Sequence, residues 1–131
     1  PAFQQAALDY YSLPVRYRAL PTPPERLSDE VKRLRGGELL GANVTIPYKE
    51  RVVPLLDGLD PRAVRVGAVN TIVNGRNGLV GHNTDTYGFI RSLREAGGFD
   101  PRGRSALLLG AGSICPGGRG TRLPHHRQPD P

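Results

Sequence analysis

Lys49 and Asp85 are two ionisable residues that each stand where a predicted strand is followed by a predicted helix. Lys49 follows an apolar run that is closed by Pro47. Residues at the carboxyl ends of strands line the ligand crevice of open α/β sheets, and a lysine there can pair with an anionic ligand or move a proton. Asp85 follows a second apolar run and begins an amphipathic stretch.

Asn70 and Thr45 are polar residues at comparable positions, beside short apolar runs. Each of the four residues also has a purely structural interpretation. Lys49 can be a solvated residue at a helix start, Asp85 can be a helix N-cap, Asn70 can satisfy a loop, and Thr45 can be a β-branched strand residue. Residue type and spacing alone leave both interpretations open for each of them.

Short apolar runs alternate with amphipathic stretches along the chain, which predicts an α/β fold. The Asn-Gly pairs within 74–78 predict a hairpin turn, because they accept positive φ at low cost. Helices are expected over 2–12, over a stretch opened by Pro23 and Pro24 and ended by Gly36, from Pro47 through Val53, over 62–66, and from Thr84 or Asp85 through Ala96. Strands are expected over 15–20, 39–46, 68–73, 79–80 and 105–109.

Two helices carry an apolar face that predicts how they pack. Leu27, Val31 and Leu34 recur at i, i+4 and i+7, so they are expected to face the core. In the last helix the inward residues are expected to be Phe89, Leu93 and Ala96.

Three motifs together resemble the shikimate dehydrogenase family. The segment Gly41-Ala42-Asn43-Val44-Thr45-Ile46-Pro47-Tyr48-Lys49 resembles the most diagnostic motif of that family. The segments Gly67-Ala68-Val69-Asn70-Thr71 and Gly81-His82-Asn83-Thr84-Asp85 resemble the next two, in the same order and at similar intervals. The resemblance covers residues 1–112. It extends to residues 1–8, where Gln4-Gln5 replaces the usual His-Asn, and it places the family's substrate-binding Ser-x-Ser just before Pro1.

From the pattern and the resemblance we expect an α/β fold: a three-layer sandwich with a mixed, mostly parallel sheet, followed by the first strand of an incomplete Rossmann domain. Residues 1–103 are then a substrate-binding domain, and residues 104–112 begin an NADP-binding domain. Residues 113–131 form an irregular tail, for which a reading-frame slip after Gly112 and a natural tail are both open explanations.

The resemblance also assigns roles to the polar residues. It implies that Lys49 is the catalytic proton donor and acceptor, that Asp85 is its carboxylate partner, and that Thr45, Lys49, Asn70 and Asp85 bind shikimate or 3-dehydroshikimate. Reducing a ring ketone needs a proton on oxygen as hydride reaches carbon. The cofactor NADP is expected on the glycine-rich turn that begins with Gly110, Ala111 and Gly112.

The implied activity leaves alternatives open. A quinate/shikimate dehydrogenase that uses NAD would carry the same motifs, and so would a non-catalytic remnant that only binds a small molecule. A chain without the rest of the cofactor domain is expected neither to hold NADP well nor to transfer hydride. Members of the family at full length are monomers or homodimers.

Composition excludes several other classes of protein. The formal net charge of +6 comes from arginines scattered among acids, and Lys32 and Lys49 are the only lysines. The sequence has no uninterrupted basic run with interleaved aromatic residues, so a nucleic-acid partner is not expected. Cys115 is a single cysteine, and His125-His126 has no zinc-ligand spacing. No apolar run approaches the ~20 residues of a membrane span. A cytoplasmic enzyme is expected.

Overall fold

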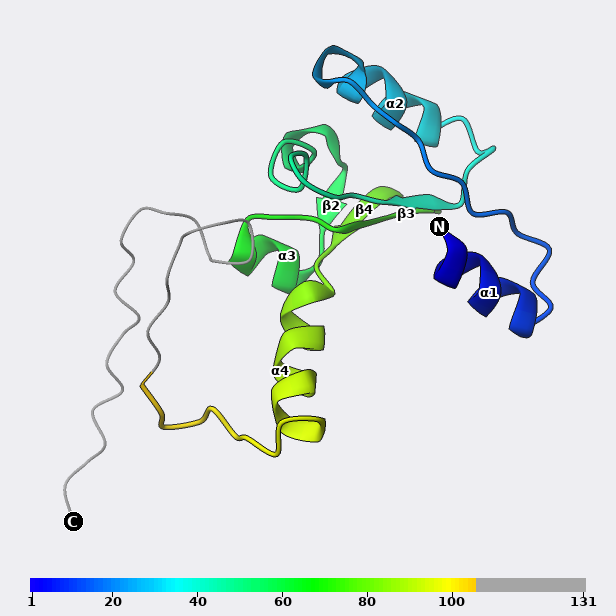
Figure 1. Cartoon of the computed structure of the whole chain (residues 1–131). Coiled ribbons are helices and arrows are strands. Elements are labelled where there is room, and N and C mark those ends of the chain that lie inside the picture. The colour runs from blue at the N-terminus through cyan, green and yellow to red at the C-terminus, as the bar shows by residue number, and fades with distance from the viewer. Residues whose placement is uncertain (106–131) are drawn as a thin grey trace.

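The computed structural model describes residues 1–105 and shows an α/β arrangement of short elements (Figure 1). The predicted strand over 105–109, the glycine turn Gly110, Ala111, Gly112 and the tail over 113–131 lie outside the described residues or at their limit. The helices are α1 (Ala2–Tyr10), α2 (Leu27–Leu34), α3 (Pro61–Val66) and α4 (Asp85–Glu95), with single 3-10 turns η1 (Pro24–Arg26) and η2 (Val53–Leu55). The strands are β1 (Gly41–Asn43), β2 (Gly58–Leu59), β3 (Thr71–Gly75) and β4 (Gly78–His82).

The four strands form one mixed sheet in the order β1-β3-β4-β2. β3 pairs antiparallel with both β1 and β4, whereas β2 pairs parallel with β4. The mixed α/β sheet is confirmed. Two of its three pairings are antiparallel, because the tight β3–β4 hairpin makes β3 run opposite to the strands on either side of it. β1, β2 and β4 still point the same way, so their carboxyl ends share one edge of the sheet.

Most of the predicted helices are confirmed, with one exception. α1, α2, α3 and α4 form where the pattern predicts them, within a few residues at each end. The helix predicted from Pro47 through Val53 is wrong: that stretch is a series of turns that ends in η2. Pro54 has no N–H to donate to a helical hydrogen bond, so a regular helix is not favoured there.

The strand predicted over 15–20 is also wrong, since this segment is extended but pairs with no strand in the described part of the chain. An alternating pattern shows that a segment can be a strand, but a ladder of hydrogen bonds also needs a neighbour. The strand predicted over 39–46 shortens to β1, and β3 begins three residues later than predicted. β2 forms where no strand was predicted.

The core lies where α2 and the loops before α3 meet one face of the sheet. Figure 1 shows α2 above the sheet, with α3 and α4 below it. The predicted inward face of α2 is confirmed, because its three apolar residues are buried. The buried cluster consists of Leu27, Val31, Leu34, Val52, Ala63, Val69, Ile72 and Leu79.

The inward face predicted for α4 is wrong. Phe89 is 58% exposed, Ala96 is exposed, and Leu93 is only half-buried. None of the α4 residues is buried, and Asp85 and Thr86 in its first turn make side-chain hydrogen bonds to the preceding part of the domain. An apolar stripe becomes buried only where another element covers it, and no described element covers this one.

Gly81 provides a test of how tightly the sheet packs. A Cβ at this position would lie 2.6 Å from a methyl of Leu56 and 2.6 Å from a methyl of Val69. We therefore expect Gly81→Ala to destabilise the fold by about 1–3 kcal/mol through overpacking. Gly75→Ala is the matched control, because a Cβ there meets nothing within 4 Å. Urea unfolding of both variants measures the difference, and equal midpoints would contradict the packing around Gly81.

No helix in residues 1–105 is both long and apolar enough to cross a membrane. No group of three His, Cys, Asp or Glu side chains within the same residues could hold a metal ion.

Candidate active site

Lys49, Asn70 and Asp85 meet at the edge of the sheet where β1 and β4 end and β3 begins. The Asn70 backbone links the ends of β1 and β4. Its N–H donates to the His82 carbonyl at 3.0 Å, and its carbonyl accepts from the Val44 N–H at 2.8 Å. The Lys49 carbonyl accepts from the Val69 N–H at 2.7 Å, which ties the turn after β1 to the start of β3. The sheet itself therefore brings together residues from three separate motifs.

Lys49 and Asp85 form an ion pair, with Nζ of Lys49 2.7 Å from Oδ2 of Asp85. The two side chains are 15% and 32% exposed, so both are partly shielded from water. Asp85 is the first residue of α4, where the helix dipole favours a negative charge. Its structural interpretation as an N-cap is not what the structure shows, because the carboxylate bonds to Lys49 and Asn70.

Asn70 binds the second carboxylate oxygen. Its Nδ2 donates to Oδ1 of Asp85 at 2.8 Å and to Oγ1 of Thr84 at 2.8 Å. Its Oδ1 accepts the Thr84 N–H at 3.0 Å, which fixes the orientation of the amide because only the oxygen can accept that bond. The carboxylate of Asp85 is thus held at both oxygens, by Lys49 on one and by Asn70 on the other.

Thr45 stands apart from this cluster. It is exposed, and its carbonyl accepts from the Tyr48 N–H at 2.9 Å in the turn that leads to Lys49. In residues 1–105 its hydroxyl has no hydrogen bond to protein. The chain between Thr45 and Lys49 includes a cis peptide bond between Ile46 and Pro47. The structure therefore leaves the Thr45 hydroxyl open to solvent, four residues before the lysine.

The hydrogen bond from Lys49 to Asp85 can hold the lysine ammonium in position to act as a proton donor. An ammonium has three N–H donors, and within the described residues the Lys49 ammonium spends one of them, on Asp85. A ring oxygen or hydroxyl of a ligand can take another. A carboxylate held by an amide keeps the lysine side chain in place while a ligand binds, and a positioned donor is what general acid–base catalysis requires.

Asn83 was not predicted to be a site residue, although its hydrogen bonds connect two segments that carry the site. It is 1% exposed, and its Nδ2 donates to the carbonyl of Ala68 at 3.0 Å. Its Oδ1 accepts from the Thr86 N–H at 3.2 Å and from the Thr86 hydroxyl at 3.1 Å. Asn83 therefore joins the start of α4 to the segment before Asn70. Its place beside Thr84 and Asp85 in the third motif is the signal that could have revealed it.

Removal of the Asn83 amide should weaken the link between the start of α4 and the segment before Asn70. Asn83→Ala leaves the Ala68 carbonyl without its buried donor, so we expect a loss of about 1–3 kcal/mol in unfolding free energy. Asn77→Ala removes an amide from the exposed hairpin turn and should change stability by less than about 0.5 kcal/mol. Chemical denaturation of the two variants side by side is the measurement. A loss as small for Asn83 as for Asn77 would argue against its structural role.

The fold and this site define a small-molecule-binding α/β domain. Its lysine–carboxylate pair lies at the edge of the sheet where β1, β2 and β4 end. Residues 1–72 match the model of the shikimate dehydrogenase substrate binding domain. The chain therefore belongs to the shikimate dehydrogenase substrate-binding-domain family, as the three motifs predict.

Relatives and solved structures agree with this family. The NADP(+) shikimate dehydrogenase of Desulforamulus reducens is 47% identical over 114 residues, which are 87% of this chain and 38% of the relative. The Thermus thermophilus shikimate 5-dehydrogenase solved with shikimate has a TM-score of 0.78 at 41% identity, over 87% of this chain and 43% of that one. The Listeria monocytogenes enzyme solved with shikimate and NAD has a TM-score of 0.70 at 40% identity, over 74% and 34% of the two chains. The chain thus spans less than half the length of these relatives.

Proposed function

We propose that this chain is the substrate-binding half of an NADP-dependent shikimate dehydrogenase, which interconverts 3-dehydroshikimate and shikimate in aromatic amino-acid biosynthesis. The observation that carries the proposal is the Lys49–Asp85 pair at 2.7 Å, held by Asn70 at the ligand edge of the sheet. The family membership and the shikimate bound in the Thermus thermophilus structure support the choice of ligand.

In this proposal Lys49 performs the proton transfer. As the ring ketone is reduced, the Lys49 ammonium gives one proton to the ketone oxygen and becomes a neutral amine, and the reverse reaction returns the proton. Asp85 balances the lysine charge and orients its N–H bonds. When bound, the reduced cofactor NADPH would supply the hydride to the ring carbon, and NADP+ would accept it in the reverse reaction. The residues expected to hold its pyrophosphate, Gly110, Ala111 and Gly112, lie outside the described residues, so their fit to NADP stays a prediction.

Substrate recognition is assigned to the polar groups around this pair. Thr45, Asn70 and Asp85 are proposed to bind the ring hydroxyls. The exposure of Thr45 supports its part in this proposal, because its hydroxyl is open to a ligand. A site made of such groups rejects analogues that lack the matching hydroxyls, because its own polar atoms would then lose their partners.

Two alternatives compete with this proposal. The first is a quinate/shikimate dehydrogenase that uses NAD, which the NAD bound in the Listeria monocytogenes structure supports. A non-catalytic remnant that binds substrate without turnover is the second. A cytoplasmic location and a monomeric or dimeric state are proposed by analogy with the family.

Two assays on the 131-residue chain distinguish these functions. Titration with shikimate, followed by NMR, should shift resonances of Lys49, Asn70 and Asp85, whereas a cyclohexene carboxylate without ring hydroxyls should not. Oxidation of NADPH that depends on 3-dehydroshikimate measures turnover. Binding without turnover supports a substrate-binding half or a remnant, and the absence of any shift with shikimate would overturn the proposed ligand. Replacing shikimate with quinate, and NADPH with NADH, tests the other enzyme.

A further inference from the structure

A line of hydrogen bonds runs from Tyr17, which lies far from Lys49 in the sequence, to the carboxylate of Asp85. The Tyr17 hydroxyl donates to Oδ1 of Asn43 at 2.8 Å. Nδ2 of Asn43 donates to Oγ1 of Thr71 at 3.1 Å, and the Thr71 hydroxyl donates to Oδ1 of Asn70 at 3.2 Å. Asn70 then donates to Asp85 at 2.8 Å. Every bond in the line points toward the carboxylate.

Two backbone groups fix the direction of this line. The Asn70 carbonyl accepts from Nδ2 of Asn43 at 3.4 Å, so the Asn43 amide must turn its oxygen toward Tyr17. The Thr84 N–H donates to Oδ1 of Asn70, so the Asn70 amide must turn its nitrogen toward Asp85. Since the Thr71 oxygen accepts one bond from Asn43, its single hydrogen goes to Asn70. Bonds aligned in one direction polarise one another and strengthen the last of them.

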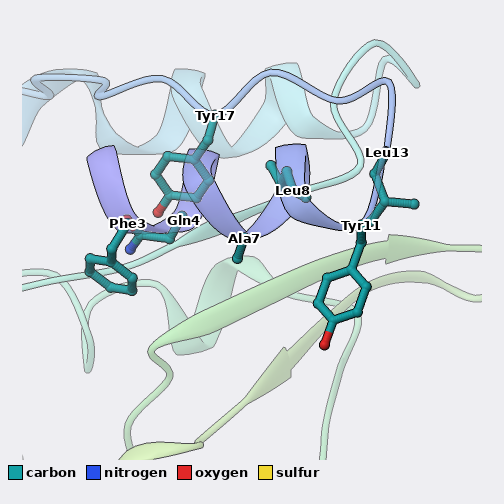
Figure 2. A pocket seen from close by; sticks show the side chains of 7 residues that line it. All are labelled: Phe3, Gln4, Ala7, Leu8, Tyr11, Leu13 and Tyr17. Atoms are coloured by element: carbon teal, nitrogen blue, oxygen red, sulfur yellow. The ribbon is translucent and has the colours of Figure 1, made fainter.

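Helix α1 holds Tyr17 at the start of this line. Oε1 of Gln5 accepts the Tyr17 N–H at 2.7 Å, and Nε2 of Gln5 donates to the Val15 carbonyl at 3.3 Å. One glutamine side chain thus bonds the extended segment in the manner of a neighbouring strand. Figure 2 shows the Tyr17 ring beside α1, where it lines an open apolar groove of about 350 Å³ with Phe3 and Gln4 among others.

We propose that Tyr17 is a positioning residue for the Lys49–Asp85 pair, acting through Asn43, Thr71 and Asn70. The proposal rests on the proposed function in one respect: the pair it positions is taken to be the proton-transfer pair. Without the phenolic hydroxyl, the Asn43 amide loses its outer partner, Thr71 is held less firmly, and the Asn70 amide is freer to leave Asp85. Tyr17 itself is separated from Asp85 by three residues and does not touch the pair.

The test uses the 131-residue chain and two readouts. Hydrogen exchange of the Asn70 side-chain amide, followed by NMR, reports the end of the line directly and needs no ligand. Shikimate affinity reports the consequence for binding. One neutral hydrogen bond corresponds to about a two- to tenfold effect. We expect Tyr17→Phe to accelerate Asn70 amide exchange and to weaken shikimate binding, each by about that factor.

Matched variants separate this role from a general loss of structure. Tyr10→Phe removes the same atom from a residue that is 82% exposed and should change neither readout. Thr71→Val should reproduce the effect of Tyr17→Phe, whereas Thr71→Ser keeps the hydroxyl and should behave like the wild type. Because the bonds act in series, the double variant Tyr17→Phe/Thr71→Val should be less impaired than the sum of the two single variants.

The two readouts fail separately. Wild-type exchange of the Asn70 amide in Tyr17→Phe, or exchange that rises equally in Tyr10→Phe, overturns the positioning role. Accelerated exchange in both Tyr17→Phe and Thr71→Val supports it, whether or not the chain binds shikimate. Absence of shikimate binding by the wild-type chain counts against the proposed function alone.

Discussion

Replacing Lys49 with methionine should lower the rate of 3-dehydroshikimate reduction by about 10²–10⁴-fold, the usual contribution of a general acid. Methionine fills a similar volume but has no proton to give. Because the chain spans less than half of its relatives' length, the rate is measured in this chain joined to the cofactor-binding half of the Thermus thermophilus enzyme. Asp85→Asn should lower the rate as well, and should also weaken shikimate binding.

The other lysine of the chain supplies the control for this prediction. Lys32 lies on α2 with its side chain 71% exposed, and within residues 1–105 its one ion pair is with Asp29 at 3.4 Å. Lys32→Met removes the same charge away from the site, so the rate should stay within about twofold of the wild type. The two lysine variants should give equally folded proteins by circular dichroism. A near-normal rate for Lys49→Met would refute its assignment as the proton donor.

Leu79→Ala should have a larger effect on stability than Gly81→Ala or Asn83→Ala. Leu79 is 0% exposed and belongs to the buried cluster between α2 and the sheet. Truncation of a buried leucine removes its transfer free energy and leaves a cavity, which together cost about 2–5 kcal/mol. Leu79 also precedes the site on β4, so weaker packing there should reduce the affinity for shikimate.

An exposed leucine is the matched control for Leu79. Leu40 is 68% exposed, and Leu40→Ala should change the unfolding free energy by no more than about 0.5 kcal/mol. Urea unfolding followed by circular dichroism, with the slope of the transition compared as well as its midpoint, measures both variants. If the two leucines cost the same, the buried cluster does not contribute to stability as the structure implies.

Local patterns were enough to predict most of the elements. The i, i+4, i+7 spacing of Leu27, Val31 and Leu34 predicts a buried helix face, and these residues are buried. The Asn-Gly pairs predict the hairpin that joins β3 to β4. Both signals depend on residues close together in the chain, where backbone preference and side-chain periodicity act directly.

For two of the failed predictions, the missing information was a distant partner. The segment over 15–20 alternates like a strand, but its neighbour is the Gln5 side chain rather than a strand. The apolar stripe of α4, with Phe89 at its centre, stays exposed because no described element covers it. Sequence patterns show which side of an element is apolar, but tertiary contacts decide whether that side is buried.

The sequence by itself determined which family this chain belongs to and which polar residues to examine, because the three motifs carry Lys49, Asn70 and Asp85 in a recognisable order. Only the tertiary structure decided how they interact. Lys49 and Asp85 are 36 positions apart, and Asn70 and Asp85 are 15 positions apart, so their contacts depend on how the strands of the sheet pair. Contacts with Gln5 and Asn43 placed Tyr17 at the outer end of the line that reaches Asp85, and no local pattern contains these contacts.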